Sequence, residues 1–253
     1  MKKTALIIAA MAVAGVSYAD NVTTRPSYSV TSDFSYTSEY VFRGIKQSNA
    51  AFQGSVEVGQ DDARLGVWTS QPINAKKYIN EIDFYAGYKV KLDRDFKVDF
   101  VGTYYYYPES NTAVGQTHQS YELGVGGIYS LGGLTPALSG VDASLYYYYD
   151  FRLHQQTLQA SLGYSIPLKD FGTSLDFNVF AGTAAASNYA PDAVGDRLHE
   201  SWNFYGVGLN IPYKLAENAQ VHIGGALSQN DKYFYGFHPH QDASINAGVT
   251  IGF

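Results

Sequence analysis

Residues 81–92 read EIDFYAGYKVKL, and apolar and polar side chains alternate along the whole stretch. In an extended strand, one face would carry Ile82, Phe84, Ala86, Tyr88, Val90 and Leu92, and the other would carry Glu81, Asp83, Tyr85, Gly87, Lys89 and Lys91. Successive side chains of a β-strand point to opposite sides, so this pattern predicts a strand with one apolar and one polar face. Such strands are typical of transmembrane β-barrels, in which one face meets lipid and the other faces the lumen.

Segments of similar length and pattern follow one another along the rest of the chain, and helical periodicity is not evident. We expect about twelve strands, at 30–43, 51–60, 63–70, 80–92, 95–107, 118–130, 138–151, 155–166, 173–183, 200–213, 218–228 and 243–253. An even number places both ends of the barrel chain on the periplasmic side. The sequence therefore predicts an all-β fold, a closed antiparallel up-and-down transmembrane barrel that occupies residues 20–253.

The connections between these segments support the same topology. The short ones are 61–62, 93–94, 131–136, 168–172 and 215–218, and the long, polar ones include 108–117, 184–199 and 230–242. Short and long connections alternate, as periplasmic turns and extracellular loops do in outer-membrane barrels. The connection at 152–154 is the exception, because it is short on the predicted extracellular side.

The two ends of the chain carry export features. Lys2 and Lys3 precede an apolar run at 5–16 and a small-residue site at 17–19, so we expect a signal peptide at 1–19 that is cleaved after Ala19. No later run is long and apolar enough for a transmembrane helix. The last expected strand ends on Phe253, the C-terminal aromatic that such barrels present to the barrel assembly machinery.

The composition favours a membrane barrel over a nucleic-acid-binding protein. The formal net charge is −6, and removing the two lysines of the signal leaves −8, which argues against nucleic acid as a partner. The chain has 23 Tyr and 14 Phe, and several of them lie at the expected strand ends: 104–107, 146–149, Tyr129, Tyr164, Tyr213 and Phe253. Aromatic rings favour the two interfaces between lipid and water. A periplasmic β-sandwich is the alternative that these patterns leave.

A family resemblance agrees with this fold. Residues 35–48 (SYTSEYVFRGIKQS), 66–68 (GVW) and 81–88 (EIDFYAGY) resemble the TorF-type porin family of proteobacteria. The resemblance extends over nearly the whole mature chain and is most specific in these segments. It implies an outer-membrane barrel with pore activity, and it implies no particular catalytic or substrate-binding residue.

The expected lumen face carries charged side chains of both signs. The pore-lining candidates by strand parity are Asp33, Glu39, Glu57, Glu81, Asp83, Asp99, Glu122, Asp142, Asp150 and Asp176, together with Arg43, Arg64, Lys89, Lys91 and Lys97. Because acidic residues predominate, we expect a modest preference for cations or neutral polar solutes. Alternatively, the charges pair and fill the lumen, with Glu57 facing Arg64 and Lys89 facing Asp99 across short turns.

The expected outer mouth carries a candidate constriction residue and a group of candidate tyrosines. Arg43, beside the permissive Gly44, is the best candidate for a constriction residue, and its alternative role is an ion pair with Glu39 or with a carboxylate of a neighbouring strand. Four tyrosines are candidates for a stacking platform for sugars or nucleosides: Tyr105, Tyr107, Tyr146 and Tyr148. Their alternative role is to fill a narrow barrel end and to hydrogen-bond interior carboxylates.

The sequence offers little for catalysis or for metal binding. Five of the six histidines fall in or beside expected loops, at positions 118, 154, 199, 238 and 240, and their spacing fits no regular metal site. His199, Glu200 and Ser201 are adjacent and would alternate between faces, so they form no relay. We therefore expect a passive channel for small polar or cationic solutes that uses no cofactor. The alternatives are an adhesive or structural barrel acting through residues 232–240, or a lipid-modifying enzyme.

Overall fold

The computed structural model describes residues 28–74, 78–110, 117–188, 199–232 and 241–253 of the chain. The signal peptide expected at 1–19 and its cleavage site lie outside these residues. The strands are β1 (Tyr28–Thr37), β2 (Tyr40–Phe42), β3 (Ile45–Ser48), β4 (Ala51–Gln60), β5 (Ala63–Pro72), β6 (Glu81–Lys91), β7 (Phe96–Tyr106), β8 (Gln119–Ser130), β9 (Val141–Asp150), β10 (Gln155–Leu168), β11 (Thr173–Ala186), β12 (Glu200–Ala216), β13 (Ala219–Asn230) and β14 (Gln241–Gly252).

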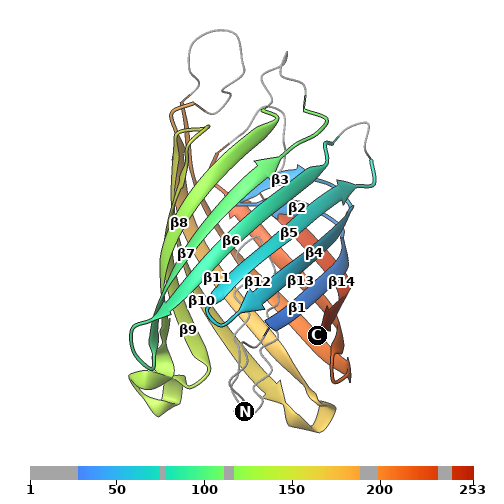
Figure 1. Ribbon diagram of the computed structural model, residues 1–253, viewed down its shortest axis with the longest axis vertical. Helices are drawn as coiled ribbons and strands as arrows, with labels where there is room; N and C mark the ends of the chain where they lie inside the picture. The colour runs from blue at the N-terminus through green and yellow to red at the C-terminus, as the bar shows by residue number, and fades with distance from the viewer. Residues whose placement is uncertain (1–27, 75–77, 111–116, 189–198, 233–240) are drawn as a thin grey trace.

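Twelve of these strands form one closed antiparallel barrel in the ring order β1-β14-β13-β12-β11-β10-β9-β8-β7-β6-β5-β4 (Figure 1). The ring closes where β1 pairs with β14, with Asp33 opposite Thr250 in the register. The main chain of Phe253 extends this pairing, because its N–H donates to the Val30 carbonyl at 2.8 Å. The predicted fold class is therefore confirmed, including the number of barrel strands.

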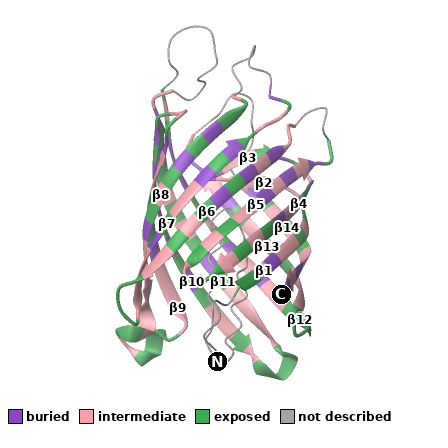
Figure 2. Ribbon diagram, viewed as in Figure 1, coloured by how far each residue is buried: buried purple, intermediate pink, exposed green. Residues whose placement is uncertain are grey.

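The barrel is polar inside and apolar outside. Along β10, Gln155, Thr157 and Gln159 are buried, whereas Leu158 and Leu162 are exposed. Figure 2 shows the same alternation as bands of buried and exposed residues along the strands. Exposed apolar side chains on a closed barrel suit a hydrocarbon surrounding and would be costly in water, so this distribution fits a transmembrane barrel.

The prediction of one continuous barrel strand at 30–43 is wrong. Barrel strand β1 ends at Thr37, and the chain then forms a separate two-stranded sheet of β2 and β3. We call residues 40–48 the lumen hairpin, because their contacts lie on the inner wall of the barrel. Residues 40–42 read YVF and are strand-forming types, so the sequence gave no sign that the chain leaves the wall before the turn.

The predicted connections agree with the structure where they are described. The turns after β4, β6 and β12 are short, and the connections after β8 and β10 contain the 3-10 helices η2 (Leu131–Gly133), η3 (Pro136–Leu138) and η4 (Lys169–Phe171). The predicted loops 108–117, 184–199 and 230–242 lie partly outside the described residues. Among the described residues, no helix is long and apolar enough to cross a membrane.

Candidate lumen constriction

The lumen hairpin turns through two residues in left-handed conformations. Phe42 pairs with Ile45, and between them Arg43 has φ 49° and Gly44 has φ 75°. Two consecutive positive φ values are the mark of a type I′ turn, whose twist suits a two-residue hairpin. Gly44 is also fixed by space, because a Cβ there would lie 2.7 Å from the Cβ of Phe204 on the barrel wall. The turn therefore presses directly against the wall.

Two wall side chains hold the backbone of this turn. Trp202 on β12 donates its indole N–H to the Arg43 carbonyl at 2.9 Å, and the Asn230 amide on β13 donates to the Gly44 carbonyl at 2.5 Å. Ile45 packs against a small apolar cluster that includes Trp202 and Phe204. These contacts satisfy the turn carbonyls inside the barrel, where an unpaired carbonyl would be unfavourable.

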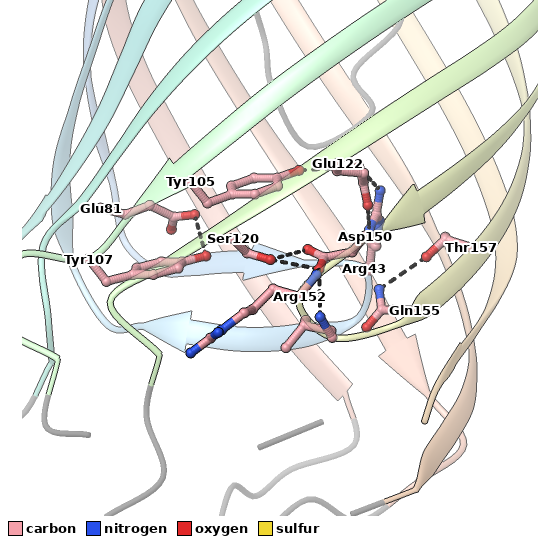
Figure 3. A network of polar contacts seen from close by, with 11 residues as sticks. Arg43, Glu81, Tyr105, Tyr107, Ser120, Glu122, Asp150, Arg152, Gln155 and Thr157 are labelled. Atoms are coloured by element: carbon pink, nitrogen blue, oxygen red, sulfur yellow. Dashed lines mark hydrogen bonds and ion pairs between the residues drawn. The ribbon is translucent and has the colours of Figure 1, made fainter. Parts of the chain in front are cut away.

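The Arg43 side chain reaches the other side of the lumen. Its guanidinium donates two hydrogen bonds to the Glu122 carboxylate on β8, at 2.7 and 2.8 Å, and both side chains are almost fully buried (Figure 3). The guanidinium carbon also lies 4.8 Å from the ring centroid of Tyr148. β8 is almost opposite β1 in the ring. The lumen hairpin therefore spans the barrel, and Arg43 occupies the position of a constriction.

The base of the lumen hairpin is attached to a third part of the wall. Lys46 forms ion pairs with Glu39 and with Asp242 on β14, the latter at 3.9 Å. The ring of Tyr40 lies 5.3 Å from that of Trp68 on β5. Together with the contacts on β8, β12 and β13, these interactions fix the hairpin on several sides.

The wall formed by β5 to β9 carries a second ion-paired cluster. Arg64 on β5 donates to both oxygens of Asp99 on β7, at 2.8 and 3.0 Å, and Tyr146 donates to the same carboxylate at 2.8 Å. β6 lies between the two partners, and Gly87 stands opposite Arg64 in the register. A side chain at Gly87 would overlap the Arg64 guanidinium, so this glycine gives Arg64 room to cross β6.

The four candidate tyrosines lie on the inner face near the lumen hairpin. Tyr105 donates to Glu122 at 3.3 Å, and Tyr107 donates to Glu81 at 3.2 Å (Figure 3). The Tyr146 and Tyr148 rings stack on each other, with centroids 5.6 Å apart and planes 9° apart. The aromatic rings are thus engaged with carboxylates, with Arg43 and with one another.

The remaining carboxylates of the inner face have different surroundings. Asp142 accepts from Ser130, Asp150 accepts from Ser120 and from the Arg152 and Leu153 N–H groups, and Asp176 accepts from Ser165, at 2.6 to 2.9 Å. Asp83 is 1% exposed, and neither carboxylate oxygen has a hydrogen-bond partner among the described residues. Asp83 is therefore the least compensated carboxylate of this wall.

The structure forms different ion pairs from those predicted by sequence. Arg64 takes Asp99 as its partner in place of Glu57, which lies only close enough for a longer-range electrostatic interaction with Arg64. Lys89 does stand opposite Asp99 in the register, but the contact with Asp99 belongs to Arg64. Arg43 pairs with Glu122 across the lumen, instead of with Glu39 or a neighbouring strand.

Sequence reasoning missed several residues of the constriction, namely Lys46, Trp202, Phe204, Asn230, Asp242 and His222. The one local signal was the dipeptide Arg43-Gly44 between two apolar residues, which fits a tight hairpin turn. The long-range partners have no local signal. Among the described residues, no group of three or more His, Cys, Asp and Glu could hold a metal ion, and His238 and His240 lie outside them.

The fold, a closed antiparallel barrel, is similar to that of solved outer-membrane porins and channels. The NanC porin has 13% sequence identity and a TM-score of 0.55, over 88% of this chain and 98% of NanC. The KdgM porin has 11% identity and a TM-score of 0.53, over 88% and 99% of the two chains. The COG4313 outer membrane channel from Pseudomonas putida F1 has 11% identity and a TM-score of 0.54, over 94% and 100%.

The chain belongs to the Gcw_chp family, described as a bacterial protein of unknown function, whose model matches residues 21–192. That match covers the lumen hairpin and the ion-paired wall but ends before β12. No curated protein matches the chain. The TorF-type name is not part of the family match and stays a prediction.

Proposed function

We propose that the protein is an outer-membrane channel for the passive diffusion of small polar or cationic solutes. The observation that carries this proposal is a polar-lined cavity beside the lumen hairpin, bordered by β1, β4, β13 and β14. A hairpin held within a barrel narrows the passage and leaves the remaining space lined by polar side chains. The expected signal peptide and the TorF-type resemblance support the same function, and neither requires a cofactor or an enzymatic activity.

The location and the assembly route belong to this proposal. The exposed apolar side chains of the barrel suit membrane lipid, and Phe253, which is 76% exposed beyond the last barrel strand, suits recognition by the barrel assembly machinery. The expected signal peptide would deliver the chain to the periplasm. The outer membrane is therefore the proposed site of action.

The cation preference is the finer part of the proposal. Acidic side chains predominate on the inner face, and some of them, such as Asp142 and Asp176, are partly exposed and form no ion pair with a described residue. Unpaired acidic groups would raise the local concentration of cations in a narrow passage. Paired groups such as Asp99 would contribute less, because the Arg64 charge offsets theirs.

Planar bilayers containing the refolded mature chain test the proposal. We expect discrete conductance steps, and a reversal potential in a KCl gradient that indicates K⁺ passing more readily than Cl⁻. Asp142→Asn should reduce this preference, while Asp62→Asn, a change in the turn after β4, serves as the control. No conductance at any salt concentration would refute the channel, and clear anion selectivity would refute the cation preference alone.

A further inference from the structure

The cavity beside the lumen hairpin differs chemically from the crowded wall of β5 to β9. It has a volume of about 180 Å³ and lies between the hairpin and the strands β1, β4, β13 and β14, with single contributions from β5, β10, β11 and β12. Pockets for drug-sized ligands are larger, roughly 300–1,000 Å³. A solute held in this cavity would therefore be about the size of one sugar ring.

The charged side chains that border the cavity already have partners. Asp33 accepts from Thr250 at 2.7 Å and contacts His222 at 2.9 Å. Glu39 and Asp242 share Lys46. Arg43, the remaining charged group of the lining, is held by Glu122. An anionic solute would find no uncommitted cation here, because carboxylates already bind Arg43 and Lys46, and it would have to lose water without compensation.

Four of the uncharged amide side chains of the cavity, in contrast, lack hydrogen-bond partners among the described residues. Gln159, Asn210, Gln220 and Asn246 border it, and their amides form no hydrogen bond with any described residue. The Ser228 hydroxyl is buried and also has no partner among those residues. Each amide offers two N–H donors and one acceptor oxygen, and these groups remain accessible to water or to a ligand in the cavity. Hydroxyl groups both donate and accept, so neighbouring hydroxyls on one solute match such amides.

An apolar surface completes the lining. Tyr40 and Trp68, whose rings are in contact, border the cavity on the hairpin side, and Phe180 borders it from β11. Aromatic rings supply apolar contact area, and a few convergent polar groups then orient the ligand. A sugar ring would match both parts of this lining, with its C–H face on the aromatic rings and its hydroxyl groups on the amides.

We infer that this cavity is a binding subsite for an uncharged, polyhydroxylated solute of monosaccharide size. The inference rests on the proposed channel function, because it names the class of solute that would occupy the passage. The amides would hold the hydroxyls, and the committed cations around the cavity would disfavour anionic analogues.

The test uses the refolded mature chain and D-glucose, with gluconate and glucosamine as anionic and cationic comparisons. The two tryptophans of the chain both lie beside this region, since Trp68 borders the cavity and Trp202 holds the hairpin, so their fluorescence reports occupancy without requiring conductance. Block of the bilayer current by glucose is the second readout. We expect a saturable response to glucose in both assays and a much weaker response to the anionic gluconate.

Variants of single cavity residues test whether the glucose response arises in this cavity. Gln159→Leu and Gln220→Leu remove single amides from the cavity, and each should weaken glucose binding by about 2- to 10-fold, the usual effect of one hydrogen bond. Gln156→Leu is the matched control, because this exposed neighbour on β10 points away from the lumen. It should bind glucose as the wild type does.

The outcomes separate this inference from the proposed channel. Conductance without a glucose response, or an equal response to all three solutes, would overturn the subsite and leave the channel intact. A glucose response without conductance would support the subsite and overturn the channel. If both cavity variants bind glucose like Gln156→Leu, the site lies elsewhere and the inference is wrong.

Discussion

Arg43→Met should release the tip of the lumen hairpin from β8. The side chains of Arg43 and Glu122 are only 6% and 4% exposed, and two hydrogen bonds join them. In the variant, the Tyr105 hydroxyl at 3.3 Å is the hydrogen-bond donor that Glu122 keeps among the described residues. Removing one partner of a buried ion pair costs about 3–5 kcal/mol, because the other charge is left uncompensated.

This cost exceeds what the other contacts of the turn supply. The hydrogen bonds from Trp202 and Asn230 to the turn carbonyls are worth about 1 kcal/mol each. At 1.4 kcal/mol per factor of ten, the ratio of docked to released hairpin should fall by roughly two to three orders of magnitude. A hairpin that leaves its position widens the passage, so the open-channel conductance and its noise should both increase.

Single-channel recording of Arg43→Met beside Arg94→Met measures this effect. Arg94 forms an exposed ion pair with Asp95 in the turn after β6, and such pairs contribute little, so the control should conduct like the wild type. The double variant Arg43→Met with Glu122→Met removes both buried charges and should be more stable to urea than either single variant. Wild-type conductance in Arg43→Met, or a double variant less stable than both single variants, would refute the reasoning.

Three other substitutions test separate parts of the inner wall. Gly44→Ala should lower the thermal unfolding midpoint and raise conductance, because the φ of 75° and the nearby wall leave no room for a side chain. Gly172 also has a positive φ, 63°, but open space surrounds it, so the control Gly172→Ala should show only the backbone cost of about 1 kcal/mol. Asp83→Asn should leave the urea midpoint unchanged or raise it, since it removes a buried charge without a partner among the described residues, and a large loss would show that the ionised carboxylate is stabilised. Asp99→Asn should cost about 1.5–3 kcal/mol in urea unfolding because it weakens the contact with the partly exposed Arg64, and an unchanged midpoint would contradict that pairing.

The barrel strands could be predicted because their period is local. The predicted strand 80–92 corresponds to β6 (Glu81–Lys91), and the predicted strand 155–166 corresponds to β10 (Gln155–Leu168). In each case one face meets the outside and the other meets the lumen, so the alternation of side chains follows from burial. Parity also placed Glu81 and Asp83 on the inner face, where the structure buries them.

The constriction could not be predicted in the same way, because Tyr40, Val41 and Phe42 favour a strand whether it lies in the wall or in a hairpin inside the barrel. What distinguishes residues 40–48 is the left-handed turn at Arg43 and Gly44, together with partners far away in the sequence. Arg43 finds Glu122 79 residues later, and Trp202 reaches the Arg43 carbonyl over 159 residues. These separations depend on the strand order and register of the closed barrel, which a single sequence does not specify.

The predicted ion pairs were wrong for a related reason. Pairing of Glu57 with Arg64 assumed that the two face each other across the hairpin, but in the register Arg64 stands opposite Gly59 and Glu57 stands opposite Gly66. Arg64 therefore crosses Gly87 on β6 to reach Asp99 on β7. The absence of a side chain at Gly87 is what opens this route, and it becomes meaningful only once the neighbouring strand is known.

The lumen hairpin divides the interior into two unequal parts, and its anchors determine their widths. On the side of β5 to β9, ion pairs and stacked tyrosines occupy the space, so the hairpin is tied to a crowded wall through Arg43 and Glu122. On the side of β1, β4, β13 and β14, the lining is amide-rich and encloses the cavity. A solute would pass on this second side. The strength of the ion pair between Arg43 and Glu122 would then set the distance between the hairpin and the amide-rich wall. Selectivity and passage width would then depend on one ion pair located outside the amide-lined wall itself.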